Sequence, residues 1–327
     1  MNHGVLTAGQ IKALVFSVTV AVLAYLLLSL STEWQEVLHA YQTIGWSGLG
    51  VTLALSLVNY GLRFIRWQMY LSALGHRQPW LRSAVIYFAG FALTTTPGKA
   101  GEMLRGVFLK PYGMPYVRST AAFLSERLSD LFAVVLLCLT GVTLYKQGSL
   151  FVFLGLGLIV LAQMLLSSKR LMTFCSAWLM SKRGKLSTLL SHLVSMLLEA
   201  RRCHRLSLQI PALLLSLVAW SAEAYAFYLI LNWTGFTASY SFAFSVYALS
   251  MLAGALSFLP GGLGGAEAIM IGLLLWAGMG EPQAIAATVV IRLVTLWFAV
   301  GLGCFALLWV GKISPHIKHE PRPSKAV

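Results

Sequence analysis

Charged side chains follow a helix-breaking Pro-Gly pair inside an otherwise apolar part of the sequence. The stretch TTTPGKAGEMLR (94–105) comes directly after RSAVIYFAGFAL and places Lys99, Glu102 and Arg105 within about two helical turns. A second Pro-Gly pair opens LPGGLGGAEA, which contains Glu267. The start of a helix after such a break attracts anions, and nearby cations strengthen that attraction. The carboxylates could pair with these cations when no ligand is present, or carry a proton.

Further ionisable residues lie within the apolar segments themselves. Glu126, Arg127 and Asp130 occur in VRSTAAFLSERLSD, and Arg292 follows the second break. Glu126 and Asp130 are four residues apart and therefore project from one face of a helix. Two hypotheses fit these charges: a site for an anionic ligand, or buried ion pairs that fix helix packing. For Arg105 and Asp130, snorkelling at a helix end is a further alternative.

We assign the predicted roles by charge. The predicted substrate-binding residues are Lys99, Arg105, Arg127 and Arg292. The predicted gating or charge-balancing residues are Glu102, Glu126, Asp130 and Glu267. The predicted hairpin breaks are Pro97, Gly98, Gly101, Pro260, Gly261, Gly262 and Gly264. Glycines also allow close packing of helices, although GGLGG is denser than packing needs.

Composition indicates a membrane protein. Of the 327 residues, 58% are hydrophobic and 10% are charged, whereas globular domains carry about 25% charged residues. The net charge of +14 lies mainly in segments between apolar runs, which is typical of membrane topology and argues against nucleic-acid binding. The sequence has no GxSxG, HExxH or P-loop motif, and its cysteines and histidines lack metal-ligand spacing. We therefore predict no catalytic residue, no metal site and no cofactor.

We predict an all-α polytopic membrane protein with about six full spans and two re-entrant helical hairpins. The full spans are expected at 11–30, 46–67, 117–145, 149–167, 208–231 and 284–311. The hairpins are expected at 82–112 and 239–281. Residues 1–311 would form a single integral membrane domain, and 312–327 a basic cytoplasmic tail.

Lysine and arginine positions predict that both termini are cytoplasmic. The segments 63–82 and 168–207 are rich in basic residues, whereas 31–45 and 232–241 have none. Placing the basic segments inside leaves Lys146 as the exception. Each hairpin then makes an even number of crossings.

Two of the basic segments need a closer description. The first, 63–82, includes Arg63 and Arg66, which this topology places in a cytoplasmic connection. The second, 168–207, has leucines at helical spacing. It could be an interfacial amphipathic helix held by anionic lipids, or an ordinary solvated connector.

The two broken regions resemble each other. PGKAGE (97–102) compares with PGGLGGAE (260–267), and each is followed by an arginine in an apolar run, Arg127 or Arg292. One extra span separates the two units and reverses the second. We therefore predict an inverted repeat, an arrangement typical of transporters with a site near the membrane midplane. The predicted halves are 46–145 and 208–311.

The motifs TPGKAGEMLR, SERLSD and LPGGLGGAEA, with Arg292 following, resemble the membrane domain of lysylphosphatidylglycerol synthases, within the flippase-like UPF0104 set. The resemblance covers most of the chain and implies a polytopic lipid translocase fold. In two-domain members it implies a membrane domain that flips aminoacylated phosphatidylglycerol. This sequence ends at 327 without a synthetase domain, so aminoacyl transfer is not implied and the cargo stays open.

The leading hypothesis is an inner-membrane flippase for an anionic or polyprenyl-linked envelope lipid, working by alternating access at a cationic midplane site. Its partners would be an anionic phospholipid or a lipid-linked intermediate in a bacterial plasma membrane. The alternative is a non-transporting accessory subunit of a lipid-modifying or glycan-assembly pathway. That alternative predicts paired buried charges and no cavity between the hairpins. A membrane-embedded enzyme would need a nucleophile or metal site that the sequence does not offer.

Overall fold

The fold is helical throughout the part of the chain that the structure describes. The computed structural model describes residues 8–96, 100–141, 149–168, 173, 194–257, 259 and 261–313. All regular structure in these ranges is helical, which confirms the predicted all-α class. Three helical stretches are long and apolar enough to cross a bilayer: Gln35–Ala73, Leu206–Trp233 and Glu281–Val310. The chain is therefore a polytopic membrane protein.

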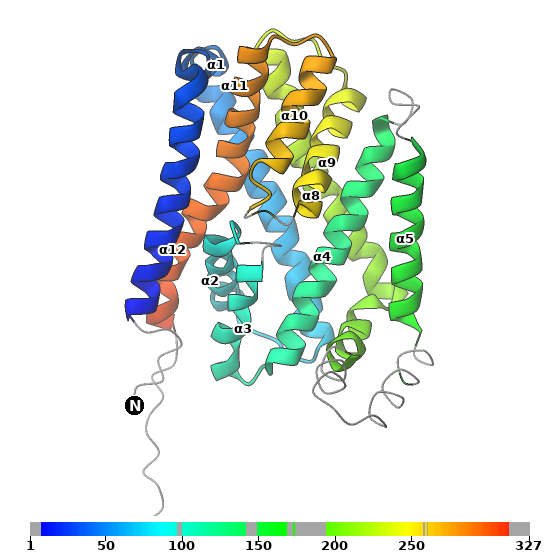
Figure 1. The fold of residues 1–327 in the computed structure, drawn as a ribbon. Helices are drawn as coiled ribbons and strands as arrows, with labels where there is room; N and C mark the ends of the chain where they lie inside the picture. The colour runs from blue at the N-terminus through cyan, green and yellow to red at the C-terminus, as the bar shows by residue number, and fades with distance from the viewer. Residues whose placement is uncertain are drawn as a thin grey trace, which may run out of the picture.

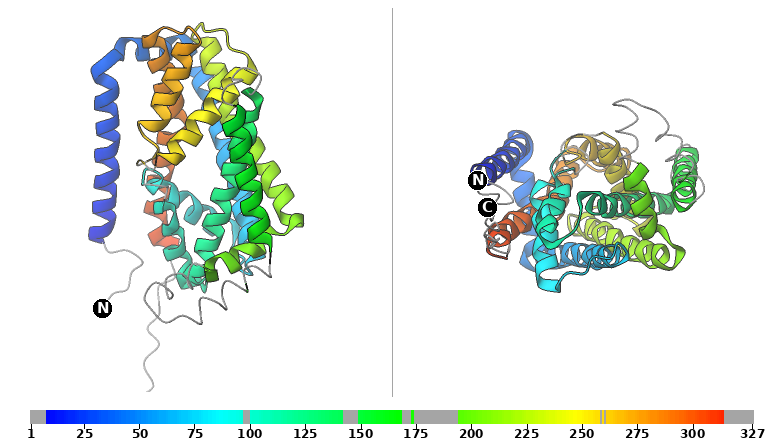
Figure 2. Two further views of the ribbon diagram at one scale, coloured as in Figure 1. Left: turned by 45° about the vertical axis from the view of Figure 1, so that its right-hand side comes forward. Right: turned by 90° about the horizontal axis from the view of Figure 1, so that it is seen from below.

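The first helical element, α1 (Ala8–Ala73), turns back on itself. Its dark blue leg rises along the outside of the bundle in Figures 1 and 2, and its lighter blue leg descends through the bundle. Gly45, within this element, has φ +68, a left-handed conformation that glycine adopts without strain. The predicted spans 11–30 and 46–67 therefore belong to two legs of one element.

Two half-length hairpins enter the bundle from opposite ends (Figure 1). The first consists of α2 (Trp80–Ala89) and α3 (Leu104–Leu109) and starts and ends at the lower end. The second consists of α9 (Tyr240–Leu256) and α10 (Gly265–Trp276) and starts and ends at the upper end. Short 3-10 turns continue the first hairpin: η1 (Gly90–Leu93), η2 (Ala100–Met103) and η3 (Lys110–Tyr112).

The tips of the two hairpins meet in the middle of the bundle. A Cβ atom added to Gly261 would lie 3.3 Å from the Cα atom of Thr95. Of the predicted breaks, Gly261 thus lies where the hairpins meet. Four of the predicted residues lie outside the described part of the chain: Pro97, Gly98, Lys99 and Pro260.

Longer helices surround the hairpins. They are α4 (Tyr116–Cys138) with the turn η4 (Leu139–Gly141), α5 (Ser149–Ser167), α8 (Leu206–Trp233) after the turn η6 (Arg201–His204), α11 (Glu281–Arg292) and α12 (Phe298–Ile313). A π-helical turn, η7 (Leu293–Trp297), joins α11 to α12. α5 stands at the edge of the bundle, and the first residues of α1 lie at the same lower end as the last residues of α12 (Figure 1). Most of the predicted amphipathic segment and residues 314–327 of the predicted tail lie outside the described residues.

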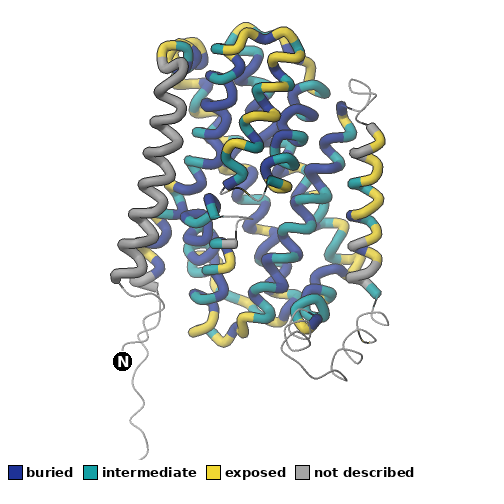
Figure 3. The backbone as a smooth tube through the Cα atoms, viewed as in Figure 1, coloured by how far each residue is buried: buried dark blue, intermediate teal, exposed yellow. Residues whose placement is uncertain are grey.

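Two apolar cores hold the bundle together. The upper core joins the four helices α8, α9, α10 and α11 to the upper part of α4, and it includes Phe227 and Tyr247. The lower core joins α1, α2, α3 and α12 and includes Trp67 and Tyr87. Buried residues continue through the middle of the bundle between these cores (Figure 3). The hairpin tips lie at this middle depth, where the buried polar residues gather.

Candidate functional site

A layer of charged side chains lies between the two apolar cores, at the depth of the hairpin tips. Its arginines are Arg63, Arg66, Arg105, Arg127 and Arg292, and its carboxylates are Glu102, Glu126, Asp130, Glu223 and Glu267. We call this set the charged layer. Arginines and carboxylates are equal in number among these described residues. Burial of charges is costly unless they are paired, and the pairs described below meet that requirement.

The first hairpin contributes a tightly paired cluster. The Arg105 guanidinium donates to Glu102 Oε2 at 2.6 Å and to Glu126 Oε2 at 2.8 Å. Its central carbon lies 4.2 Å from the centre of the Tyr87 ring, a cation–π distance. All three charged residues are at most 2% exposed. Arg105 is thus held between two carboxylates inside the protein and does not snorkel to an interface.

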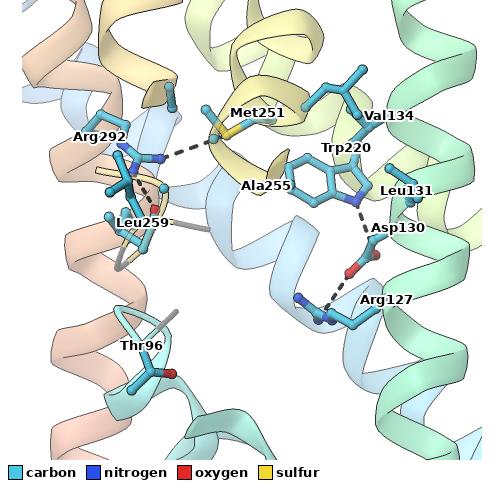
Figure 4. Close-up of a pocket in the computed structure, with 16 residues that line it drawn as sticks. Thr96, Arg127, Asp130, Leu131, Val134, Trp220, Met251, Ala255, Leu259 and Arg292 are labelled. Carbon is cyan, nitrogen blue, oxygen red and sulfur yellow. Dashed lines mark hydrogen bonds and ion pairs between the residues drawn. The ribbon is translucent and has the colours of Figure 1, made fainter. Parts of the chain in front are cut away.

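Asp130 joins three arginines from two helices. Its carboxylate lies 3.1 Å from Arg63, 2.7 Å from Arg66 and 3.1 Å from Arg127. The indole N–H of Trp220 also donates to Asp130 at 3.1 Å, as Figure 4 shows. Asp130 is 5% exposed and forms a link between α1, α4 and α8. It therefore does not snorkel at a helix end.

The predicted cytoplasmic position of Arg63 and Arg66 is wrong. Both lie within α1, 5% and 0% exposed, because α1 continues to Ala73 and its arginines meet Asp130 inside the bundle. Sequence reasoning missed this pair. Two arginines three residues apart lie on one helix face, and their apolar context in NYGLRFIRWQMYLSA was the signal that could have found them.

The second hairpin has its own ion pair. Arg292 Nε donates to Glu267 Oε1 at 2.6 Å, and Arg292 Nη2 donates to the Gly261 carbonyl at 3.0 Å. Glu267 Oε2 also accepts the Gly264 N–H at 2.7 Å. Glu267 therefore caps the start of α10, so the chain's own carboxylate satisfies part of the helix N-terminus that was predicted to attract an anion.

The first hairpin has no matching α-helical start. After the break the described chain resumes as the 3-10 turn η2, and the Gly101 N–H donates to Thr96 Oγ1 at 2.6 Å. A Cβ atom on Gly101 would lie 2.3 Å from the Leu93 Cβ. Gly101 is thus needed for close packing, the alternative role considered for the glycines.

The two hairpins make corresponding contacts with the helices that follow them. Arg127 Nη2 lies 3.4 Å from Glu102 Oε2, and Arg292 Nε lies 2.6 Å from Glu267 Oε1. The partners of both pairs are 25 residues apart in the sequence. Each hairpin glutamate therefore contacts an arginine of the next helix.

A π-helical turn follows Arg292 at the level of the charged layer. Such turns disturb the regular hydrogen bonding of a helix and often occur at functional sites. Here α1 supplies the missing donors: Ser56 Oγ donates to the Val294 carbonyl at 2.7 Å, and the Tyr60 hydroxyl donates to the Thr295 carbonyl. The turn is thus supported by its neighbour.

A cavity of about 300 Å³ lies between the tip of the second hairpin and α4, and it reaches Thr96 at the tip of the first hairpin. Arg292 borders it from one side, and Arg127 and Asp130 of α4 border it from the other (Figure 4). The remaining lining residues are Thr96, Leu131, Val134, Trp220, Met251, Leu252, Gly254, Ala255, Leu259, Gly261, Gly262, Ala266 and Leu296. The volume falls at the lower end of the range for ligand pockets, which is about 300–1,000 Å³. We call this space the central cavity.

A smaller cavity of about 40 Å³ shares part of this lining. Trp220, Met251 and Arg292 line both spaces, and the smaller one reaches Glu102 and Glu223. The Tyr247 hydroxyl donates to Glu223 at 2.7 Å. The smaller cavity thus lies between the central cavity, with which it shares lining residues, and two inner carboxylates of the charged layer.

Apart from Gly101, described above, the predicted site residues within the described part of the chain divide into three groups. Arg127, Asp130, Arg292, Gly261 and Gly262 line the central cavity. Glu267, Glu102, Glu126 and Arg105 lie behind these residues as ion-pair partners. Gly264 supports the second hairpin with φ +85. The side chain of Arg127 is 21% exposed and that of Arg105 is 2% exposed, so Arg127 is the more accessible of these two cations.

Comparison with known proteins places the sequence in a family. Residues 12–303 match the family described as the lysylphosphatidylglycerol synthase TM region. A UPF0104 membrane protein of Methanothermobacter thermautotrophicus is 22% identical over 92% of this chain and 94% of its own length. A UPF0104 membrane protein of Pyrococcus horikoshii is 24% identical over 80% of this chain and 91% of its own.

Shorter matches are somewhat more similar. A 106-residue stretch is 32% identical to a UPF0104 membrane protein of Methanothermobacter thermautotrophicus, and this match spans 32% of that relative. A 97-residue match at 35% identity spans 29% of its relative. The family match, by contrast, extends over nearly all the helices described above. The chain belongs to the lysylphosphatidylglycerol synthase transmembrane-region family.

Proposed function

We propose that this protein moves an anionic or polyprenyl-linked lipid across the membrane, with the lipid headgroup bound in the central cavity. One observation carries the proposal. The cavity lies beside the point where the two hairpin tips meet, lined by Thr96 of the first hairpin and mainly by the second hairpin and α4, and it combines arginines with apolar walls. A headgroup needs the arginines, and the attached hydrocarbon tolerates the apolar walls. This role is transport and not catalysis.

Charge balance suggests how an anion would bind. The described arginines of the charged layer already face an equal number of carboxylates. An added anion must therefore replace a carboxylate or arrive with a proton, since an uncompensated buried charge is costly. Glu267 fits the first role: its 2.6 Å contact with Arg292 lies next to the cavity. A headgroup that displaces Glu267 would take over Arg292.

The hairpins supply the elements that would alternate access. One hairpin enters the bundle from its lower end and the other from its upper end (Figure 1), and residues of both line the cavity. Their tips contact each other closely, since a Cβ atom on Gly261 of the second hairpin would lie 3.3 Å from the Cα atom of Thr95 in the first. Movement of either hairpin would open the cavity toward one side, as in transporters with broken helices at a midplane site. We propose that both hairpins are re-entrant and belong to an inverted repeat.

The distribution of basic residues orients this scheme in a plasma membrane. Arg77, Lys110 and Arg205 are exposed near the lower end of the bundle. At the upper end, the connections 234–239 and 277–280 carry no lysine or arginine. The positive-inside rule then places the lower end, with both termini, in the cytoplasm.

A non-transporting accessory subunit is the second candidate. The extensive pairing of the charged layer favours it, because paired charges can serve packing alone. It offers no reason for the central cavity. Transport measurements separate the two candidates.

The proposal is tested in liposomes that contain fluorescent lipids and a quencher in the outer solution. Wild-type protein should equilibrate at least one anionic or polyprenyl phosphate lipid faster than protein-free liposomes. Arg127→Gln and Arg292→Gln should each slow this lipid equilibration at least tenfold, because each substitution removes a cation from the cavity wall. Arg77→Gln, an exposed arginine outside the cavity, is the matched control. Equal rates in wild type, both cavity variants and empty liposomes would leave the accessory role.

A further inference from the structure

A second groove lies at the lower end of the bundle, on the opposite face of α4 from the central cavity. Its volume is about 470 Å³, and it is bordered by α4, α5, η6 and the start of α8. Leu131 and Val134 of α4 line the central cavity, whereas Phe132 lines this groove. We call it the α5 groove. The transport scheme assigns it no role.

A buried amide in the α5 groove lacks a protein partner. Gln163 lines the groove and is 6% exposed. Neither Oε1 nor Nε2 makes a hydrogen bond within the described part of the chain. Leaving buried amide atoms unpaired costs free energy. This arrangement is expected where a ligand supplies the missing partners.

Positive charge gathers at the same groove. Arg201 and Arg205 line it. Arg205 makes no ion pair with a described residue, while the nearby carboxylate of Glu199 contacts Arg118 at 3.5 Å and Arg202 at 3.2 Å. Arg205 immediately precedes α8, whose start has no side-chain cap. The free amides and positive dipole end of this long helix add to the attraction for an anion.

The groove also offers neutral donors and apolar surface. His204 lines it and is 3% exposed. Burial lowers the pKa of His204 to about 4, so the ring is neutral at pH 7 and carries one N–H donor. Val160 and Met164 line the side formed by α5. Leu158 on the same helix is 67% exposed, which is expected of a helix face turned toward lipid.

We propose that the α5 groove is a second binding site, which holds the phosphate of an anionic lipid headgroup near the cytoplasmic surface. Arg201 and Arg205 would bind the phosphate oxygens, Gln163 would donate from its Nε2, and the acyl chains would lie against Val160 and Met164. A soluble phosphate ion shares the headgroup chemistry. The apolar side and the edge position of α5 favour the lipid. The bound lipid would tie α5 to the rest of the bundle.

The site is tested with photoactivatable phosphatidic acid, whose headgroup is the phosphate alone. Purified full-length protein in detergent is cross-linked, digested, and analysed for label on α5 peptides. Labelling should be saturable and competed by unlabelled phosphatidic acid more than by phosphatidylcholine. Arg205→Gln and Gln163→Leu should each reduce it at least fivefold. Gln163→Leu is informative because it removes a buried unpaired amide and should not lower the thermal stability of the lipid-free protein.

Controls separate this site from the central cavity and from a soluble anion. Arg77→Gln should keep wild-type labelling of α5, and so should Arg127→Gln, whether or not Arg127→Gln impairs transport. Equal competition by phosphatidylcholine, or undiminished labelling in Arg205→Gln and Gln163→Leu, would overturn the proposal. Competition by inorganic phosphate without competition by unlabelled phosphatidic acid would overturn the assignment to a lipid.

Discussion

At the scale of single residues, Asp130 has the most demanding position in the charged layer. Its carboxylate contacts Arg63, Arg66 and Arg127 within 3.1 Å. Asp130 is 5% exposed. If its negative charge were lost, little solvent could reach the arginines to compensate them. Asp130 thus holds α1 to α4 as well as bordering the central cavity.

Asp130→Asn should destabilise the protein. The amide keeps the shape of the side chain but removes its charge, which leaves Arg63 and Arg66 without the carboxylate that they both contact. Breaking a buried ion pair from one side costs about 3–5 kcal/mol. The apparent melting temperature in detergent, followed by tryptophan fluorescence, should fall clearly.

The control for Asp130→Asn is Glu281→Gln, which removes an exposed carboxylate at the upper end of α11. It should melt like the wild type. If Asp130→Asn and Glu281→Gln had the same apparent melting temperature, the contacts of Asp130 would contribute little to stability. The role of Asp130 would then lie in the cavity alone.

The sequence allowed part of the charged layer to be predicted. Glu267 was predicted because it follows a Pro-Gly break, and Arg292 because it lies in an apolar run. Charged residues are rare in such segments and usually have a function. Arg63 lies in both the predicted span 46–67 and the basic segment 63–82, and the positive-inside rule places that segment in the cytoplasm. A helix boundary shifted by a few residues moves an arginine from the interior to the cytoplasm.

At the scale of elements, the packing of the first hairpin against α12 depends on a glycine. Gly303 lies in α12, and a Cβ atom there would lie 2.1 Å from the Ala92 nitrogen and 2.6 Å from the Phe91 carbonyl carbon. These are backbone atoms, which cannot rotate away as a flexible side chain would. α12 and the turn η1 can therefore approach closely only because Gly303 has no side chain.

Gly303→Ala should lower the apparent melting temperature by displacing this hairpin. Overpacking of this kind typically lowers the free energy of unfolding by about 1–3 kcal/mol. Gly301→Ala is the matched control, because it lies two residues away in α12 with nothing within 4 Å of the added Cβ. Alanine favours helix over glycine by up to about 1 kcal/mol at both positions. The difference between the two variants thus reports the hairpin contact. Equal melting temperatures would contradict the packing described here.

The positions of the elements were predictable to different degrees. The spans at 149–167 and 208–231 are mostly apolar along their length, and helices occupy both. The reversal within α1 was expected as a connection between spans, and the structure makes it helical. Local sequence cannot show that the hairpin tips meet, since this depends on contacts such as Thr95 with Gly261 between distant segments.

At the scale of the whole molecule, two apolar cores enclose one charged layer. Apolar packing above and below fixes the helices, and the costly charges are confined to the depth where the hairpins end. This division predicts how the molecule sits in a membrane. In the proposed arrangement each hairpin starts and ends on one side of the membrane, and the two hairpins use opposite sides.

Cysteine accessibility tests this arrangement with exposed positions that bracket each hairpin. Arg77→Cys and Lys110→Cys flank the first hairpin, and Thr237→Cys and Gln283→Cys flank the second. In a background without native cysteines, an impermeant maleimide applied to intact cells should label the second pair. The first pair should react only after the membrane is opened, because the proposed topology places the basic lower end in the cytoplasm. If Arg77→Cys and Lys110→Cys were labelled from opposite sides, the first hairpin would cross the membrane. The alternating-access scheme would then fail, because it requires two hairpins that enter from opposite sides.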